Sequence, residues 1–364
     1  REAFVVRRRW IDEAAYADLV ALCQFLPGPA SSQVGIGIGL AKGGLPGAFA
    51  AWTGFTLPSA IALMLFGYGV VSAGDALPAG LLAGLKVVAV AVVAQAVWGM
   101  AKVLCPDAVR ATFAVLAAIG VLALATAWAQ VAVIAAGGVA GLVLLKPQAD
   151  KATRPLGITI PRSLALACLA AFFAILIGLP IIAGAWGGQA LNLIDSFYRA
   201  GSLVFGGGHV VLPLLQAEVV PPGWVTRDAF LAGYGAAQAV PGPLLTFAAY
   251  LGTVSGPAPN GALGALICLL SVFAPSFLLV IGALPFWDSL RSAPAMQKAL
   301  MGINAAVVGL LLAALYDPVW TGAIRGPWDF ALTLACFAML ALWKMPPWAV
   351  VVFSALAGWA LAAF

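Results

Sequence analysis

The chain has 364 residues, of which 63% are hydrophobic and only 9% are charged, and its formal net charge is +5. Soluble domains carry about 25% charged and about 45–50% apolar residues, so this composition argues against an aqueous globule, a disordered tail and a nucleic-acid-binding domain. At about 20 apolar residues per spanning helix, the chain has room for about ten membrane elements. We therefore expect an all-α, polytopic integral membrane protein.

Nine apolar stretches are long enough to cross a bilayer. In chain order they cover residues 46–71, 78–100, 111–128, 129–145, 161–183, 260–284, 296–315, 328–343 and 346–363. A polar, proline-containing linker follows the fourth stretch. The expected organisation is an N-terminal repeat at 1–145, a cytoplasmic linker at 146–160, a connecting transmembrane helix at 161–183 and a C-terminal repeat at 188–364.

Three further apolar segments, residues 12–42, 188–219 and 226–255, are interrupted. Their interruptions are Pro27-Gly28-Pro29, Phe205-Gly206-Gly207-Gly208-His209 and Pro241-Gly242-Pro243. A proline inside a helix removes a hydrogen bond and clashes with the preceding turn, so each segment should form two half-helices. The second proline of each PGP motif is expected to be the first residue of a new helix.

The two PGP segments belong to an internal repeat. A shift of 214 residues aligns, without a gap, Trp10 with Trp224, Gln24 with Gln238 and the first PGP with the second. After small insertions, Pro58-Ser59 aligns with Pro275-Ser276 and Lys86 with Asn304. The partner of Phe205 would lie upstream of Arg1, so we expect about one segment of the first repeat to precede Arg1.

Charge predicts how the repeats lie in the membrane, because Lys and Arg gather on the cytoplasmic side. With the linker inside, 14 of the 18 Lys and Arg residues fall inside. Residues 12–42 must then begin and end on the same face, as a re-entrant hairpin. The odd span at 161–183 inverts the second repeat, which gives two inverted-topology repeats.

Broken helices at matching positions of inverted repeats point to a site near the bilayer midplane. Half-helix N-termini present free amides that suit an anion. The candidate binding residues are Gln24, Gly28, Pro29, Ser31, Ser32, Lys86, Gly206, Gly207, Gly208, His209, Gln238, Gly242, Pro243, Thr246 and Asn304. Structural alternatives stay open: the PGP motifs could only kink packed helices, the glutamines could bond between helices, Lys86 could reach the interface, and His209 could be a packing residue.

Asp195 and Arg199 have the i, i+4 spacing of a local ion pair on a helix, so they are interpreted as structural or coupling charges. The five cysteines are scattered without CxxC spacing. No cysteine or carboxylate lies at metal-ligand spacing in the sequence from the one histidine. Neither a metal nor a cofactor is expected.

Taken together, these motifs resemble the chromate ion transporter family. The resemblance rests on the repeated W-x13-Q-x2-P-G-P pattern and on the FGGGHVVLPLLQ segment at 205–216. It implies export of chromate from the cytoplasm across the bacterial inner membrane, which would confer chromate resistance. The residues themselves predict a non-enzymatic secondary transporter that works by alternating access. Because the sequence shows no nucleotide-binding motif, an ion gradient or anion exchange is expected to drive it. Sulfate or another oxyanion is the alternative substrate. An anion channel is less favoured, because polar residues are isolated. The expected partners are a small oxyanion and the lipid bilayer, and a homodimer is left open.

Overall fold

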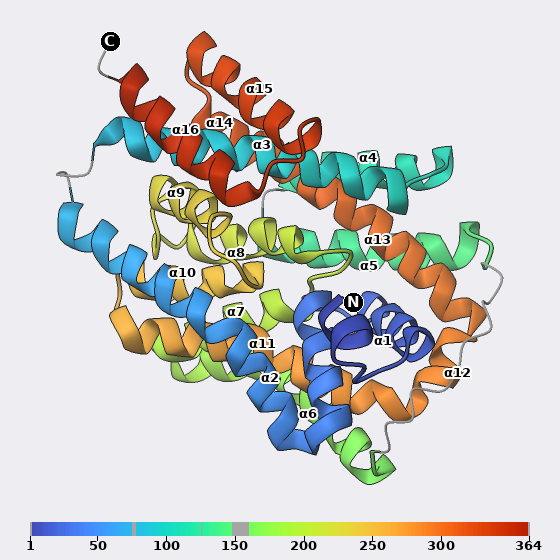
Figure 1. Ribbon diagram of the computed structural model, residues 1–364. Coiled ribbons are helices and arrows are strands. Elements are labelled where there is room, and N and C mark those ends of the chain that lie inside the picture. Colours follow the sequence, from blue (N-terminus) through green and yellow to red (C-terminus); the bar gives the residue numbers. More distant parts are fainter. Residues whose placement is uncertain (1, 75–77, 125, 148–159, 363–364) are drawn as a thin grey trace.

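The computed structural model describes residues 2–74, 78–124, 126–147 and 160–362, and these residues form helices and connecting turns (Figure 1). The first half contains α1 (Glu13–Phe25), α2 (Ala30–Ala73), α3 (Ala79–Leu104), α4 (Ala108–Leu124) and α5 (Ala127–Leu144). The second half contains α6 (Arg162–Trp186), α7 (Gln189–Ser202), α8 (Val211–Val219), α9 (Arg227–Ala237), α10 (Phe247–Val254), α11 (Gly261–Ala283), α12 (Trp287–Arg291), α13 (Pro294–Ala314), α14 (Thr321–Ala323), α15 (Pro327–Ala341) and α16 (Pro347–Leu361).

The all-α, polytopic membrane fold is confirmed. Within the described ranges, six helical stretches are long and apolar enough to cross a membrane: α2, α3, α5, α6, the stretch from α11 through α12, and the stretch from α13 through α14. The other three predicted spans are the shorter helices α4, α15 and α16. A helix of 15 residues, such as α16, is about 22 Å long at 1.5 Å per residue, which is less than the bilayer core of about 30 Å. Most of the predicted cytoplasmic linker lies outside the described residues.

All three predicted helix breaks are present. α1 ends at Phe25 and α2 begins at Ala30, while α9 ends at Ala237 and the next helical turn, η4, is Leu244–Thr246. The prediction for the second proline is off by one position, because Pro29 and Pro243 are N-cap residues. Pro29 has an extended ψ of 99°, and its carbonyl accepts the first helical bond from the amide of Gln33 at 3.0 Å. The fixed φ of proline is compatible both with the N-cap and with the first helical position. The ψ angle distinguishes the two positions, and its extended value makes Pro29 the N-cap.

A kink divides α2 into a half-helix and a longer span. Gly43 and Gly44 have non-helical backbone angles, and Gly44 has φ +60°, which favours glycine. The kink lies between the predicted segments 12–42 and 46–71. α2 therefore contains both the second half of the first broken segment and the span that follows it.

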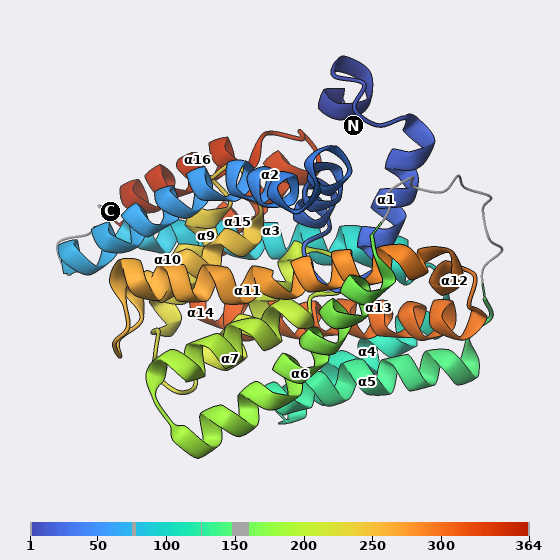
Figure 2. The ribbon, with the colours of Figure 1, turned by 90° about the horizontal axis from the view of Figure 1, so that it is seen from below.

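The two halves of the chain interlock. α3 packs against α15 and α16, whereas α13 packs against α4 and α5 (Figure 1). Close glycine contacts bring these helices together: a Cβ on Gly84 would collide with the carbonyl of Ser354, and one on Gly302 would collide with that of Gly137. Gly84 and Gly302 are aligned in the internal repeat. The equivalent helices α3 and α13 therefore make equivalent contacts, each with helices of the other half. Figure 2 shows α7 lying between α6 and α11, with which it packs.

Candidate functional site

A cavity of about 330 Å³ lies where the first PGP break meets the FGGG break and the end of α3. Its walls are mostly apolar, and they include predicted site residues from both breaks and from α13: Gln24, Gly28, Gly206, Gly207 and Asn304. We call this space the break cavity. An apolar pocket with a few convergent polar groups is the usual form of a small-ligand site.

Backbone contacts hold the two breaks together. The amide of Gly28 donates a hydrogen bond of 2.6 Å to the carbonyl of Val204, just before the FGGG segment. Gly28 has φ +127° and Gly206 has φ +75°, backbone conformations that side-chain-bearing residues rarely adopt. These glycines allow the chain to bend sharply at the cavity wall.

The first break carries several buried polar groups. Gln33 donates from Nε2 to the carbonyl of Pro27 at 2.7 Å. The Oγ of Ser276, on α11, lies 2.8 Å from the position that a Cβ on Gly28 would occupy. Ser32 and Ser276 are buried, and among the described residues neither hydroxyl, nor Gln33 Oε1, has a hydrogen-bond partner. Ser31 is exposed and lines a separate apolar groove beside α1 and α2.

The second break is bonded differently. The hydroxyl of Thr246 donates to the carbonyl of Pro243 at 2.8 Å, and Ser59 donates to the carbonyl of Pro241. A Cβ on Gly242 would collide with the side chain of Ser59. Gln238 makes a long contact of 3.4 Å to the carbonyl of Tyr234, one turn earlier on α9. The hydroxyls of Thr246 and Ser59 are therefore both hydrogen-bonded within the protein.

His209 lies in η3 (Gly208–Val210), next to the FGGG break. Its Nδ1 is 2.8 Å from the hydroxyl of Tyr234, which is fully buried on α9. The residues that line the break cavity do not include His209. Its observed partner is thus a side chain of the neighbouring helix.

Lys86 lies outside the break cavity. Its Nζ is 3.0 Å from a carboxylate oxygen of Asp228, at the start of α9. The sequence offered no acid on the same span, but the fold brings one from 142 positions away. Lys86 lines a second cavity, of about 340 Å³, together with Arg325 and Asp329. We call this second space the Lys86 cavity.

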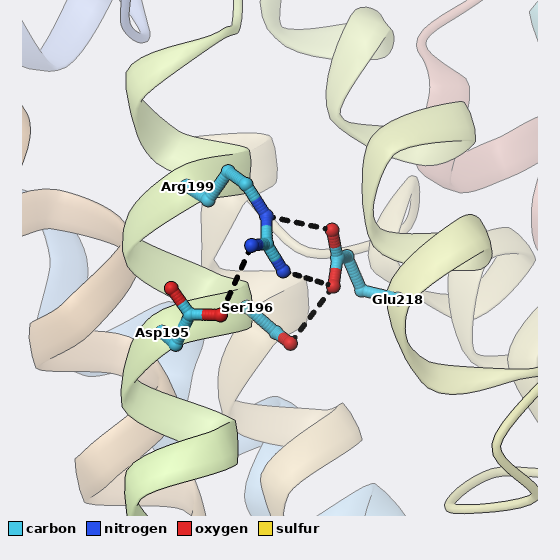
Figure 3. Close-up of polar contacts among 4 residues, drawn as sticks. All are labelled: Asp195, Ser196, Arg199 and Glu218. Carbon is cyan, nitrogen blue, oxygen red and sulfur yellow. Dashed lines mark hydrogen bonds and ion pairs between the residues drawn. The ribbon is translucent and has the colours of Figure 1, made fainter. Parts of the chain in front are cut away.

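The predicted Asp195–Arg199 ion pair is present, with Nη1 and Oδ2 3.0 Å apart. Glu218 on α8 is a second partner: it accepts from Arg199 Nε at 3.0 Å and from Nη2 at 2.7 Å. Ser196 donates to the same carboxylate at 2.8 Å. Figure 3 shows the guanidinium between the two acids. This ion cluster carries one positive and two negative charges.

Sequence reasoning missed Gln33, Glu218 and the two serines, Ser59 and Ser276. A signal existed for the serines, because each follows a proline that is repeated in both halves. Gln33 follows the predicted Ser31 and Ser32, but its aligned residue is Phe247, so the repeat did not select it.

Comparisons with known proteins agree on one family. The sequence profile of the chromate transporter family matches residues 1–142 and 191–359. A chromate transport protein of Pseudomonas aeruginosa is 30% identical, covering 99% of this chain and 86% of that protein. An uncharacterized transporter of Methanocaldococcus jannaschii is 28% identical, over 86% of this chain and 77% of its own length. A third relative, the uncharacterized transporter YwrA of Bacillus subtilis, is 28% identical, over 43% of this chain and 86% of its own length. No solved structure matches.

Proposed function

This chain belongs to the chromate transporter family, and we propose that it is a secondary transporter that exports chromate from the cytoplasm across the bacterial inner membrane. Export would confer resistance to chromate. The substrate is a small tetrahedral dianion that only accepts hydrogen bonds. The observation that carries the proposal is the break cavity, because it joins two broken helices to polar side chains inside an otherwise apolar bundle.

The break cavity suits an oxyanion for electrostatic reasons. The N-terminus of α2, whose cap is Pro29, begins beside it. Free backbone amides and the positive end of the helix dipole favour an anion at such a position. Non-helical backbone at membrane depth is tolerated where it lines a cavity. We assign chromate binding to the residues that line this cavity: Gln24, Gly28, Gly206, Gly207 and Asn304.

The distribution of basic residues supports a cytoplasmic position for the break cavity, which is consistent with the proposed export. The break cavity lies at the end of α3 that carries Lys102, an exposed residue whose Nζ is 4.5 Å from the ring centroid of Trp98. Arg110 follows after a short turn. Under the positive-inside rule this end of α3 is cytoplasmic, so chromate would be loaded from the cytoplasm. The Lys86 cavity, toward the opposite end of α3, would then face the exterior.

Alternating access would come from the two interlocked halves, which we take as inverted repeats at residues 1–145 and 188–364. Exchanged packing of α3 and α13 supports this division, because each half presents its central helix to the other. Rocking of such units around a fixed binding site is the common mechanism of inverted-repeat transporters. The break cavity lies toward the Lys102 end of α3 and not at the midpoint of that helix, where the sequence predicts the site.

The test is uptake of radiolabelled chromate into everted membrane vesicles from cells that express the full chain. We expect energised vesicles to accumulate chromate, and excess sulfate to reveal by competition whether the site accepts both dianions. Gly28→Ala should abolish uptake, because a Cβ there would collide with Gln33. Gly178→Ala is the matched control, since a Cβ at that position meets no atom within 4 Å. Accumulation equal to that of vesicles without the protein would refute the proposal, and single-channel currents would favour a channel.

A further inference from the structure

We infer that the oxyanion is held at the first break alone, where the hydroxyls of Ser32 and Ser276 donate hydrogen bonds to it, while the second break is a closed structural counterpart. This inference rests on the proposed function and refines its site. Neither serine is among the residues that line the break cavity, but Ser276 Oγ lies 2.8 Å from the Cβ position of the wall residue Gly28, and Ser32 lies two residues after the wall residue Ala30. It combines a residue of the first repeat with one of the second. The site is therefore complete only when α2 and α11, which pack against each other (Figure 1), are in place.

The repeat supplies an internal comparison. Ser32 is aligned with Thr246, and Ser276 is aligned with Ser59. At the second break both hydroxyls are used, by the carbonyls of Pro243 and Pro241. At the first break both equivalents are buried, with relative exposures of 1% and 0%, and no partner lies among the described residues. The aligned hydroxyls thus have hydrogen-bond partners at the second break and none among the described residues at the first break.

One substitution between the repeats explains the difference at Ser276. Gln33 donates to the carbonyl of Pro27, the equivalent of the Pro241 carbonyl that Ser59 uses. Its aligned residue, Phe247, has no side-chain donor, so at the second break that role falls to the serine. Gln33 therefore frees the hydroxyl of Ser276 for another acceptor.

Unpaired hydroxyls in a protein interior are unfavourable, and buried polar groups are nearly always hydrogen-bonded. Two of them at one break indicate acceptors that arrive with a ligand. The N-terminus of α2 lies at the same place, and the half-helix that begins there runs to the kink at Gly43 and Gly44. In its first turn the amide of Gln33 is bonded to the carbonyl of Pro29, and the preceding amides have no carbonyl within the helix to bond. Hydrogen-bond donors gather at this point, and the residues that line the adjacent break cavity include no Asp or Glu. This combination suits an oxyanion, which only accepts hydrogen bonds.

The experiment compares Ser276→Ala and Ser32→Ala with their aligned controls, Ser59→Ala and Thr246→Val, in purified full-length protein. Binding of radiolabelled chromate and sulfate is measured by equilibrium dialysis, transport by proteoliposome uptake, and stability by thermal unfolding without anion. The first two variants should weaken anion binding about tenfold each, as expected for loss of a hydrogen bond to a charged group. They should unfold at the same or a higher temperature than the wild type, because an unpaired hydroxyl has been removed.

The control variants should bind the anion within about twofold of the wild type and unfold at a lower temperature, because each loses a bond within the protein. Equal loss of binding in Ser59→Ala and Ser276→Ala would overturn the inference, as would unchanged binding in Ser276→Ala. Binding that depends on Ser276 in a protein that does not transport chromate would refute export and keep the site. Transport that is insensitive to Ser276 and Ser32 would refute the site and keep export.

Discussion

The ion cluster of α7 and α8 allows a prediction of stability from charge alone. Arg199 is the single cation, and it makes two hydrogen bonds to Glu218 and one ion pair with Asp195. The three side chains are only 14%, 11% and 11% exposed, so water screens them little. Arg199→Gln would leave two buried carboxylates without a positive partner, whereas Asp195→Asn would leave a balanced Arg–Glu pair.

The expected magnitudes differ between these variants. Three polar contacts inside a membrane protein at about 0.6–1.7 kcal/mol each amount to about 2–5 kcal/mol, and removal of one partner from a buried ion pair costs about 3–5 kcal/mol. Arg199→Gln should therefore lower the free energy of unfolding by about 3–5 kcal/mol. For Asp195→Asn we expect a change within about 1 kcal/mol, because the lost attraction to Arg199 is offset by removal of the excess negative charge.

Unfolding of the purified protein in mixed micelles of dodecylmaltoside and SDS, followed by tryptophan fluorescence, measures both variants. Arg227→Gln is the control, because its pair with Asp317 is exposed and exposed pairs contribute about 0–1 kcal/mol. Equal destabilisation by Arg199→Gln and Asp195→Asn would refute the assignment of Asp195 as the excess charge. An Arg199→Gln variant as stable as the control would refute the whole electrostatic account of the cluster.

Three further predictions concern α3. Gly84→Leu should destabilise the protein by about 1–3 kcal/mol through overpacking against α16. Gly178→Leu on α6 is the control, because a side chain at that position meets open space. Unfolding in mixed micelles compares the two variants. Lys86→Met should leave the KM for cytoplasmic chromate within about twofold, because Lys86 is paired with Asp228 and lies 13 residues, or about 20 Å, from the break cavity along α3. Vesicle kinetics that show a much larger KM would place Lys86 in the binding site. Lys102→Ala should raise that KM at low ionic strength and less so at high salt, since it acts by steering the anion; a change independent of salt would contradict this role.

Local physics made much of the fold predictable from the sequence. Two prolines that flank a glycine interrupt a helix, so the PGP motifs located the breaks, whereas the single prolines Pro58, Pro180 and Pro275 lie inside α2, α6 and α11. Apolar length alone located the spans. The pair of Asp195 and Arg199 follows from helical spacing, and the 214-residue shift revealed two related halves.

The tertiary structure decided which distant residues meet, because the halves interlock instead of lying side by side. Packing between the halves brings Asp228 to Lys86 and Ser276 to the break at Gly28. Within the second half, packing of α8 on α7 brings Glu218 to Arg199. Contacts across such separations leave no periodicity in the sequence. The difference between the two breaks also required the tertiary structure, since aligned hydroxyls have the same chemistry and differ only in their partners. The carbonyl of the first PGP proline accepts from Gln33 at one break and from Ser59 at the other. Thr246 bonds the carbonyl of Pro243, whereas Ser32 has no partner among the described residues.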